Sequence, residues 1–138
     1  MNGTPDPAHP ARPRRTGGVP APLVVAASLT AVEAALWVLV GVAEIAAIAG
    51  DRLAMGVTTA FFFLLYGAGL GFCAWAVTRL QGWARSPIVL AQLIQLGVAW
   101  SFRGAPWTWV ALALAVVSLI VIAGIFHPAS VDALTESE

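Results

Sequence analysis

The chain has 138 residues, of which 59% are hydrophobic and 10% are charged, and its formal net charge at pH 7 is zero. Soluble domains carry about a quarter charged residues, so this composition excludes an ordinary water-soluble domain and indicates a membrane protein. The single cysteine, Cys73, excludes an intramolecular disulfide.

Residues 1–21 are predicted to form a disordered cytoplasmic tail, because they are rich in proline and contain Arg12, Arg14 and Arg15. The apolar stretch that follows is longer than the 7 to 15 residues of a signal-peptide core. We therefore expect the first helix to be retained in the mature protein.

The first membrane helix is expected over residues 22–49, with Pro22 in its first turn. It contains two acidic residues, Glu33 near mid-depth and Glu44 near the outer boundary. Eleven residues at about 100° each place their side chains roughly 20° apart, so they share one face of the helix. Ionisable groups inside a membrane usually face the bundle and find partners there, which makes these two glutamates the best functional candidates.

The second helix is expected over residues 53–77. Gly67 and Gly71 are four residues apart and form a small-xxx-small pair, which is typical of close helix contact. A nucleotide-binding loop is not indicated, since no strand precedes these glycines. The pair therefore predicts helix packing, within the bundle or between protomers.

The third helix is expected over residues 87–102 and is short for a membrane span, which takes about 20 residues. It runs parallel to the first, and Gln95 lies about 12 Å above the start of its helix, while Glu33 lies about 16 Å above its own. Gln92 and Gln95 are thus expected to meet Glu33 in a buried polar network. Arg103, or Arg52, is expected to pair with Glu44 at the outer side.

The fourth helix is expected over residues 106–126, and residues 128–138 are expected to form an acidic cytoplasmic tail with a solvated, frayed end. The two histidines, His9 and His127, have no other metal ligands at suitable spacing. We therefore expect no metal site.

These segments predict an all-α fold, a four-helix transmembrane bundle over residues 22–127. Five arginines fall on the side of the amino terminus and two on the other side. Cytoplasmic flanks retain arginine, so we expect a multi-pass protein of the inner cell membrane with both termini in the cytoplasm.

The segment Gly82-Trp83-Ala84-Arg85-Ser86-Pro87, followed by Ile88 to Leu96 with its two glutamines, resembles a family of uncharacterised small four-span membrane proteins of actinobacteria. That resemblance implies a four-helix membrane bundle and brings no catalytic residue or cofactor. The chain is also similar to small multidrug resistance exporters, which are short, have four helices and use a carboxylate in the first helix. Glu33 matches that carboxylate, while Glu44, the short third helix and the position of the glycine pair differ.

Two interpretations of function stay open. In the first, the protein is a non-enzymatic structural or accessory membrane component, and the hydrogen bonds of Glu33 hold its helices together. In the second, it is a proton-coupled transporter of small molecules or cations, in which Glu33 binds a proton or cation and Glu44, Gln92, Gln95 and Arg103 complete the polar network. No nucleophile with a matching base occurs, so we expect no enzyme. We also expect no cofactor and no nucleic-acid partner. The expected partner is the lipid bilayer, with a homo-oligomer or another membrane protein left open.

Overall fold

The computed structural model describes residues 18–48, 53–102, 104, 106 and 108–136, and every regular element in this part of the chain is a helix. The prediction of an all-helical fold is therefore confirmed. In chain order the elements are α1 (Ala21–Ala46), α2 (Leu53–Thr78), the 3₁₀ helix η2 (Gly82–Ala84), α3 (Arg85–Ser101), α4 (Thr108–Ile125) and α5 (Pro128–Thr135).

Three of these helices are long and apolar enough to cross a membrane, namely α1 and α2 with 26 residues each and α4 with 18. The remaining long helix, α3, has 17 residues, which corresponds to about 26 Å at 1.5 Å per residue. A hydrocarbon core is about 30 Å thick, so α3 is a few ångströms shorter than a typical span. The structure thus shows a membrane protein with three candidate spans.

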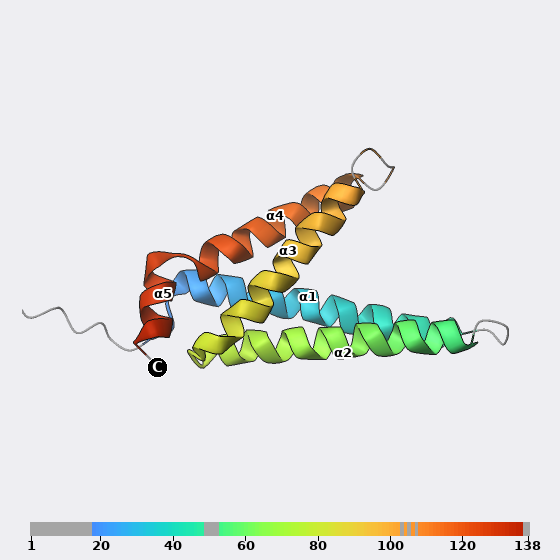
Figure 1. Cartoon of the computed structure of the whole chain (residues 1–138), viewed down its shortest axis with the longest axis horizontal. Helices are drawn as coiled ribbons and strands as arrows, with labels where there is room; N and C mark the ends of the chain where they lie inside the picture. The colour runs from blue at the N-terminus through green and yellow to red at the C-terminus, as the bar shows by residue number, and fades with distance from the viewer. Residues whose placement is uncertain (1–17, 49–52, 103, 105, 107, 137–138) are drawn as a thin grey trace, which may run out of the picture.

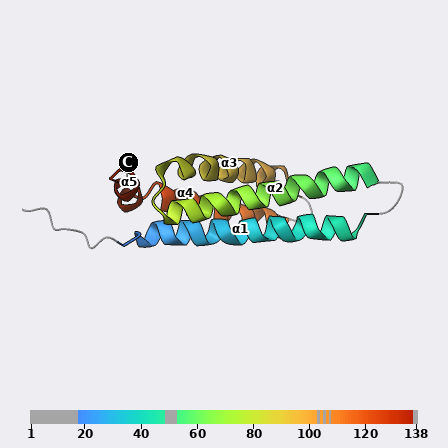
Figure 2. The same ribbon diagram turned by 90° about the horizontal axis from the view of Figure 1, so that it is seen from below.

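The long helices form two antiparallel pairs, α1 with α2 and α3 with α4 (Figure 1). The pairs lie together at the end where α5 sits and diverge toward the C-terminal ends of α1 and α3. Seen from below, α3 and α4 run alongside the part of α1 and α2 nearest to α5, and α1 and α2 extend beyond them (Figure 2). The molecule is therefore closed at one end and open at the other.

The main core fills the closed end. It contains side chains from all six elements, and five of its largest members are at most 1% exposed: Leu23, Val77, Ile88, Val121 and Ile125. Inside a membrane such packing stabilises through van der Waals contact, because lipid tails are as apolar as the side chains they replace. This end of the molecule is where both helix pairs are held together.

The outward surface of the long helices is also apolar. Large hydrophobic side chains such as Leu39, Phe61 and Leu112 are more than half exposed. A contiguous apolar surface of this kind is rare on soluble monomers but is the normal lipid-facing surface of a membrane protein. The exposed tryptophans Trp75 and Trp109 lie near the two ends of the long helices, as expected of interfacial anchors.

The prediction of a solvated, frayed end after the fourth helix is wrong for residues 128–135, which form α5. His127 caps this helix, since its Nδ1 accepts a hydrogen bond from the Ala129 amide at 3.2 Å. The Ser130 hydroxyl donates to the Gly124 carbonyl at 2.7 Å, and Leu134 is buried in the main core. These two contacts hold α5 against the closed end. The disordered amino-terminal tail was predicted over residues 1–21. Of these, residues 1–17 lie outside the described part of the chain, and Ala21 is the first residue of α1.

Candidate functional site: a buried carboxyl group joining three helices

Glu33 lies near the middle of α1 and is only 7% exposed. One turn earlier, Thr30 is fully buried, and its hydroxyl donates to the Ala26 carbonyl at 2.9 Å. That hydroxyl is therefore satisfied by its own helix, as is common for threonine in membrane helices. The Glu33 carboxyl group has to find its partners on other helices.

Both oxygens of Glu33 accept hydrogen bonds from α3. Gln92 Nε2 donates to Glu33 Oε2 at 2.6 Å, and Gln95 Nε2 donates to Glu33 Oε1 at 2.7 Å. The two glutamines are three residues apart and so project from neighbouring positions of one helix face. The structure thus brings together Glu33, Gln92 and Gln95, three residues that the sequence singled out.

The network continues to α4 through Gln95. Its Nε2 lies 3.0 Å from Ser118 Oγ and 3.5 Å from the Leu114 carbonyl oxygen. Ser118 is fully buried. The sequence analysis did not single out this serine, although it is the one polar side chain between Trp109 and Ile125. Its position as a single polar residue in an apolar helix was the feature of the sequence that could have identified it as part of the polar network.

The hydrogen bonding of the network is incomplete. Gln92 is 1% exposed, and its Oε1 has no hydrogen-bond partner among the described residues. Within the described part of the chain, Glu33 forms no ion pair, and the only charged residue of α2, α3 and α4 is Arg85, the first residue of α3. In the described part of the chain, the Glu33 carboxyl group therefore sits inside the molecule with two glutamine amides as its hydrogen-bond partners.

Glu44 occupies a separate position. It is half-buried and lies eleven residues beyond Glu33 on the same helix, about 16 Å along the axis. The partners predicted for it, Arg52 and Arg103, lie outside the described residues. The described part of the site is thus the Glu33 network, which we define as Glu33, Gln92, Gln95 and Ser118.

Helix α2 packs closely against α1 beside this network. A methyl group at Gly67 would lie 2.8 Å from the Ala34 carbonyl oxygen and 3.0 Å from the Val38 nitrogen, so only glycine permits this approach. At Gly71 the same group would be in ordinary contact with Ala34 Cβ, at 3.5 Å. The glycine pair therefore faces α1 of the same chain, and Gly67 is its close-contact member.

Aromatic side chains extend this contact toward the open end. Trp37 of α1 stacks on Phe63 with ring centroids 5.1 Å apart, and it meets Tyr66 edge-on at 5.6 Å. A tryptophan near the middle of a membrane helix is unusual, because tryptophan prefers the interfaces. Its two aromatic neighbours on α2 account for this position.

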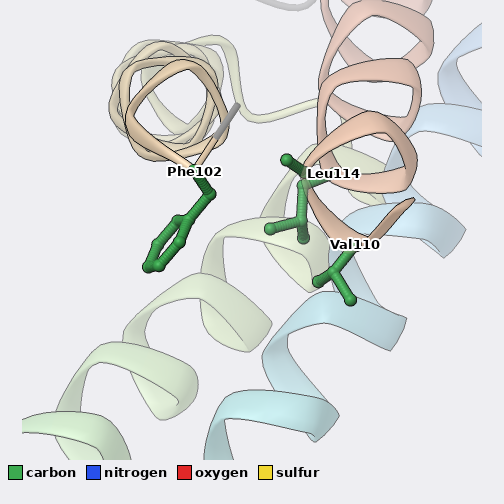
Figure 3. Close-up of a pocket in the computed structure, with 4 residues that line it drawn as sticks. Phe102, Val110 and Leu114 are labelled. Atoms are coloured by element: carbon green, nitrogen blue, oxygen red, sulfur yellow. The ribbon is translucent and has the colours of Figure 1, made fainter. Parts of the chain in front are cut away.

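Two apolar cavities flank the site. One, of about 240 Å³, lies between the end of α3 and the start of α4 and is lined by Phe102, Val110, Ala111 and Leu114 (Figure 3). The other, of about 300 Å³, lies between α2 and α3, with Leu70 and Ala91 on its wall. Glu33 lines neither of them. Among the described residues, no group of three or more His, Cys, Asp or Glu side chains comes together that could hold a metal ion.

Comparison with known proteins adds no relative to this description. No protein-family model, no curated protein and no solved structure matches the chain. The two resemblances inferred from the sequence therefore stay predictions.

Proposed function

We propose that this chain is a small, non-enzymatic structural or accessory component of the inner cell membrane, in which four helices cross the bilayer and the Glu33 network ties three of them together. One observation carries the proposal: both oxygens of a buried carboxyl group are bonded to α3, and Gln95 continues the link to α4. Hydrogen bonds between membrane helices contribute about 0.6 kcal/mol on average and up to about 1.7 kcal/mol. Several of them at one depth stabilise one arrangement of the helices.

The crossing of α3 is part of this proposal. Its 17 residues are somewhat short, but a short hydrophobic helix is accommodated by local thinning of the bilayer. Its two glutamine side chains point toward Glu33, so they do not expose polar groups to the lipid. The network also supports the crossing, because it places the middle of α3 at the same depth as the middle of α1.

Single cysteines test the topology. In a Cys73→Ala background, we expect Gly18→Cys and Glu136→Cys to react with a membrane-impermeant maleimide only from the cytoplasmic side. Ala47→Cys and Pro106→Cys should react only from the outside. All four positions are exposed. If α3 does not cross, Pro106→Cys will react from the cytoplasm and Glu136→Cys from the outside, which would contradict the proposal.

Proton-coupled transport of a cation is the second candidate. The observation that favours it is a buried carboxyl group that, among the described residues, has no cationic partner and lies next to a Gln92 oxygen with no hydrogen-bond partner there. The likeness of Glu33 to the first-helix carboxylate of small multidrug resistance exporters points the same way. The hydrogen bonding of both Glu33 oxygens to side chains of α3 supports the structural role instead.

Reconstituted vesicles separate the two candidates. The protein is placed in vesicles that enclose a pH-sensitive dye, ethidium is added as the cation, and proton movement is recorded. The structural proposal predicts no movement beyond that of protein-free vesicles, and an intact fold in Glu33→Gln. Proton movement that Glu33→Gln abolishes and the matched variant Glu44→Gln retains would replace it with the transport proposal.

A further inference from the structure

The cavity between α2 and α3 is a groove on the apolar surface of the molecule. It has a volume of about 300 Å³ and is lined by side chains from both helices. Its floor is buried, as at Leu70 and Ala91, whereas Leu65 and Leu90 on its rim are more than half exposed. The groove is therefore open to the surroundings of the helices, which are lipid tails for a protein inside a bilayer.

Gly69 of α2 lines this groove and keeps it open. A methyl group at Gly69 would meet nothing within 4 Å, whereas at Gly67 it would meet the backbone of α1. Close helix packing thus accounts for Gly67 but not for Gly69. Glycine inside a helix is destabilising relative to alanine, so its presence here needs another reason. The absent side chain leaves room for an occupant of the groove.

The groove has the depth of one lipid leaflet. It runs from Leu65, near the middle of α2, to Cys73 and Pro87, beside the turn of residues 79–84 that joins α2 to α3. Arg79 begins this turn, and the 14 residues from Leu65 to Arg79 correspond to about 21 Å at 1.5 Å per residue. Half of a bilayer, including its headgroups, is about 20–22 Å thick. A lipid whose headgroup lies at Arg79 therefore has an acyl chain that reaches the far end of the groove.

The turn beside the groove is cationic and aromatic. Arg79 follows α2, Arg85 begins α3, and both side chains are exposed. The Arg79 guanidinium lies over the Trp75 ring, 5.1 Å from its centroid. Trp83 lies between the two arginines in sequence and contacts Phe72, with ring centroids 5.9 Å apart. Tryptophan is enriched at the level of the lipid headgroups, so this turn is placed where a phosphate group would lie.

The positive charge of this turn is not balanced within the described part of the chain. Helices α2, η2 and α3 contain no aspartate or glutamate. Asp132 and Glu136, the acidic residues described after α4, form no ion pair with Arg79 or Arg85. A guanidinium group has five N–H donors in a geometry that suits phosphate. The turn is thus complementary in charge to an anionic headgroup.

We propose that the groove between α2 and α3 binds an anionic phospholipid, with an acyl chain along Gly69 and its phosphate group held by Arg79 and Arg85. Basic sites between membrane helices on the cytoplasmic side recognise anionic headgroups in this way. Binding requires α2 and α3 to lie in the bilayer, as proposed above, and the assignment to the cytoplasmic leaflet rests on the proposed topology. It requires no particular role of the Glu33 network.

Native mass spectrometry of the full-length protein in mild detergent tests the site. Phosphatidylglycerol and phosphatidylcholine with identical acyl chains serve as the probes, and we expect one phosphatidylglycerol to bind more tightly than phosphatidylcholine. Arg79→Gln combined with Arg85→Gln should weaken the binding of phosphatidylglycerol about 30-fold, at about fivefold for each cation removed from an anionic lipid. The matched pair Arg79→Lys with Arg85→Lys keeps both charges and should retain most of the binding.

The groove itself is tested with Gly69→Leu. The new side chain fills the groove and should weaken the binding of both lipids, whereas Ala68→Leu, at an exposed neighbour that does not line the groove, should leave it unchanged. Helix content by circular dichroism shows that each variant is folded. If Gly69→Leu does not fold, the two arginine pairs still decide the matter.

Three results would overturn the proposal. They are equal binding of the two lipids by the wild-type protein, equal binding by the glutamine and lysine pairs, and equal effects of folded Gly69→Leu and Ala68→Leu. A dimer in the mass spectrum that Gly69→Leu dissociates would also overturn it, because a second copy of the chain would then occupy the groove. Cysteine labelling reports separately on the topology, so a failed topology and a failed lipid site are distinguishable.

Discussion

Glu33 makes its contacts through a side chain whose two oxygens are bound by two different residues. Each of these bonds reaches α3, and the same Gln95 nitrogen lies within reach of α4. Removing one partner of a buried hydrogen bond leaves the other unsatisfied, which costs more than the bond itself contributes. The loss of stability on replacing Glu33 therefore depends on whether the new side chain can still form these hydrogen bonds.

Glu33→Leu should lower the free energy of unfolding by about 1–3 kcal/mol, because the Gln92 and Gln95 amides lose their acceptor. Glu33→Gln should cost less, since a neutral amide of the same shape still offers an oxygen and a nitrogen. Unfolding of the purified protein in mixed micelles measures both. The matched change at the half-buried carboxyl group, Glu44→Gln, should have the smallest effect; a larger loss there than in Glu33→Leu would contradict this account.

Two glycines of α2 offer a second comparison at the scale of single residues. Gly67→Ala should destabilise the protein by about 1–3 kcal/mol, because the new methyl group meets the backbone of α1 at Ala34 and Val38. At Gly69 a methyl group meets nothing within 4 Å, so Gly69→Ala should be neutral or stabilise by up to about 1 kcal/mol. Thermal unfolding of the two variants side by side gives the answer, and equal effects would show that α1 and α2 are not packed this way.

At the scale of elements, α1 and α2 form the closest helix–helix contact described above, at Gly67. Its packing comes from small residues that let two backbones approach, which is the usual device where lipid removes the hydrophobic driving force. A contact this close can be captured covalently. It also decides whether the glycine face binds its own chain or a second copy.

Ala34→Cys combined with Gly71→Cys, in a Cys73→Ala background, should form a disulfide within one chain. The Cβ atoms at these positions are 3.5 Å apart, within the range that disulfides require. Gel electrophoresis without reductant should show a compact monomer. Ala34→Cys with Gly69→Cys is the control and should stay reduced, while a cross-linked dimer of the first variant would place the glycine face between protomers.

The elements also show what the sequence can and cannot predict. Long apolar runs located α1 to α4, and axial rise alone placed Glu33 and Gln95 at similar depths, about 16 Å and about 12 Å from the starts of their helices. Axial rise could not predict that Ser118 accepts a hydrogen bond from Gln95, because the rotation of α4 about its own axis is set by helix packing and not by helix length. Helix α5 was missed because it is short and only Ser130 and Leu134 are buried, too few residues for a periodic pattern.

At the scale of the whole molecule, the lengths of the helices do not match one another. Helices α1 and α2 have 26 residues, whereas α3 has 17 and α4 has 18. In the proposed four-span arrangement, one bilayer has to accommodate both pairs. The longer pair can tilt, while the shorter one requires thinner lipid.

The reconstituted protein should therefore be more stable in bilayers of short-chain lipids than in those of long-chain lipids. The cost of mismatch is a fraction of a kcal/mol per ångström, so a change of several ångströms should shift the unfolding midpoint measurably. A series of phosphatidylcholines of increasing chain length provides the measurement. Stability that rises steadily with chain length would show that α3 and α4 do not span as proposed.

The divergence of the two helix pairs has a mechanical consequence. The two pairs are packed together near α5 and separate toward the C-terminal ends of α1 and α3 (Figure 1). When two stiff helix pairs rotate about their packed end, displacement grows with distance from that end. A small shift at the contact between Glu33 and α3 would therefore be larger at the C-terminal ends of α1 and α3. We therefore expect a change in hydrogen bonding at that carboxyl group to alter the cross-section that the protein presents to the surrounding lipid.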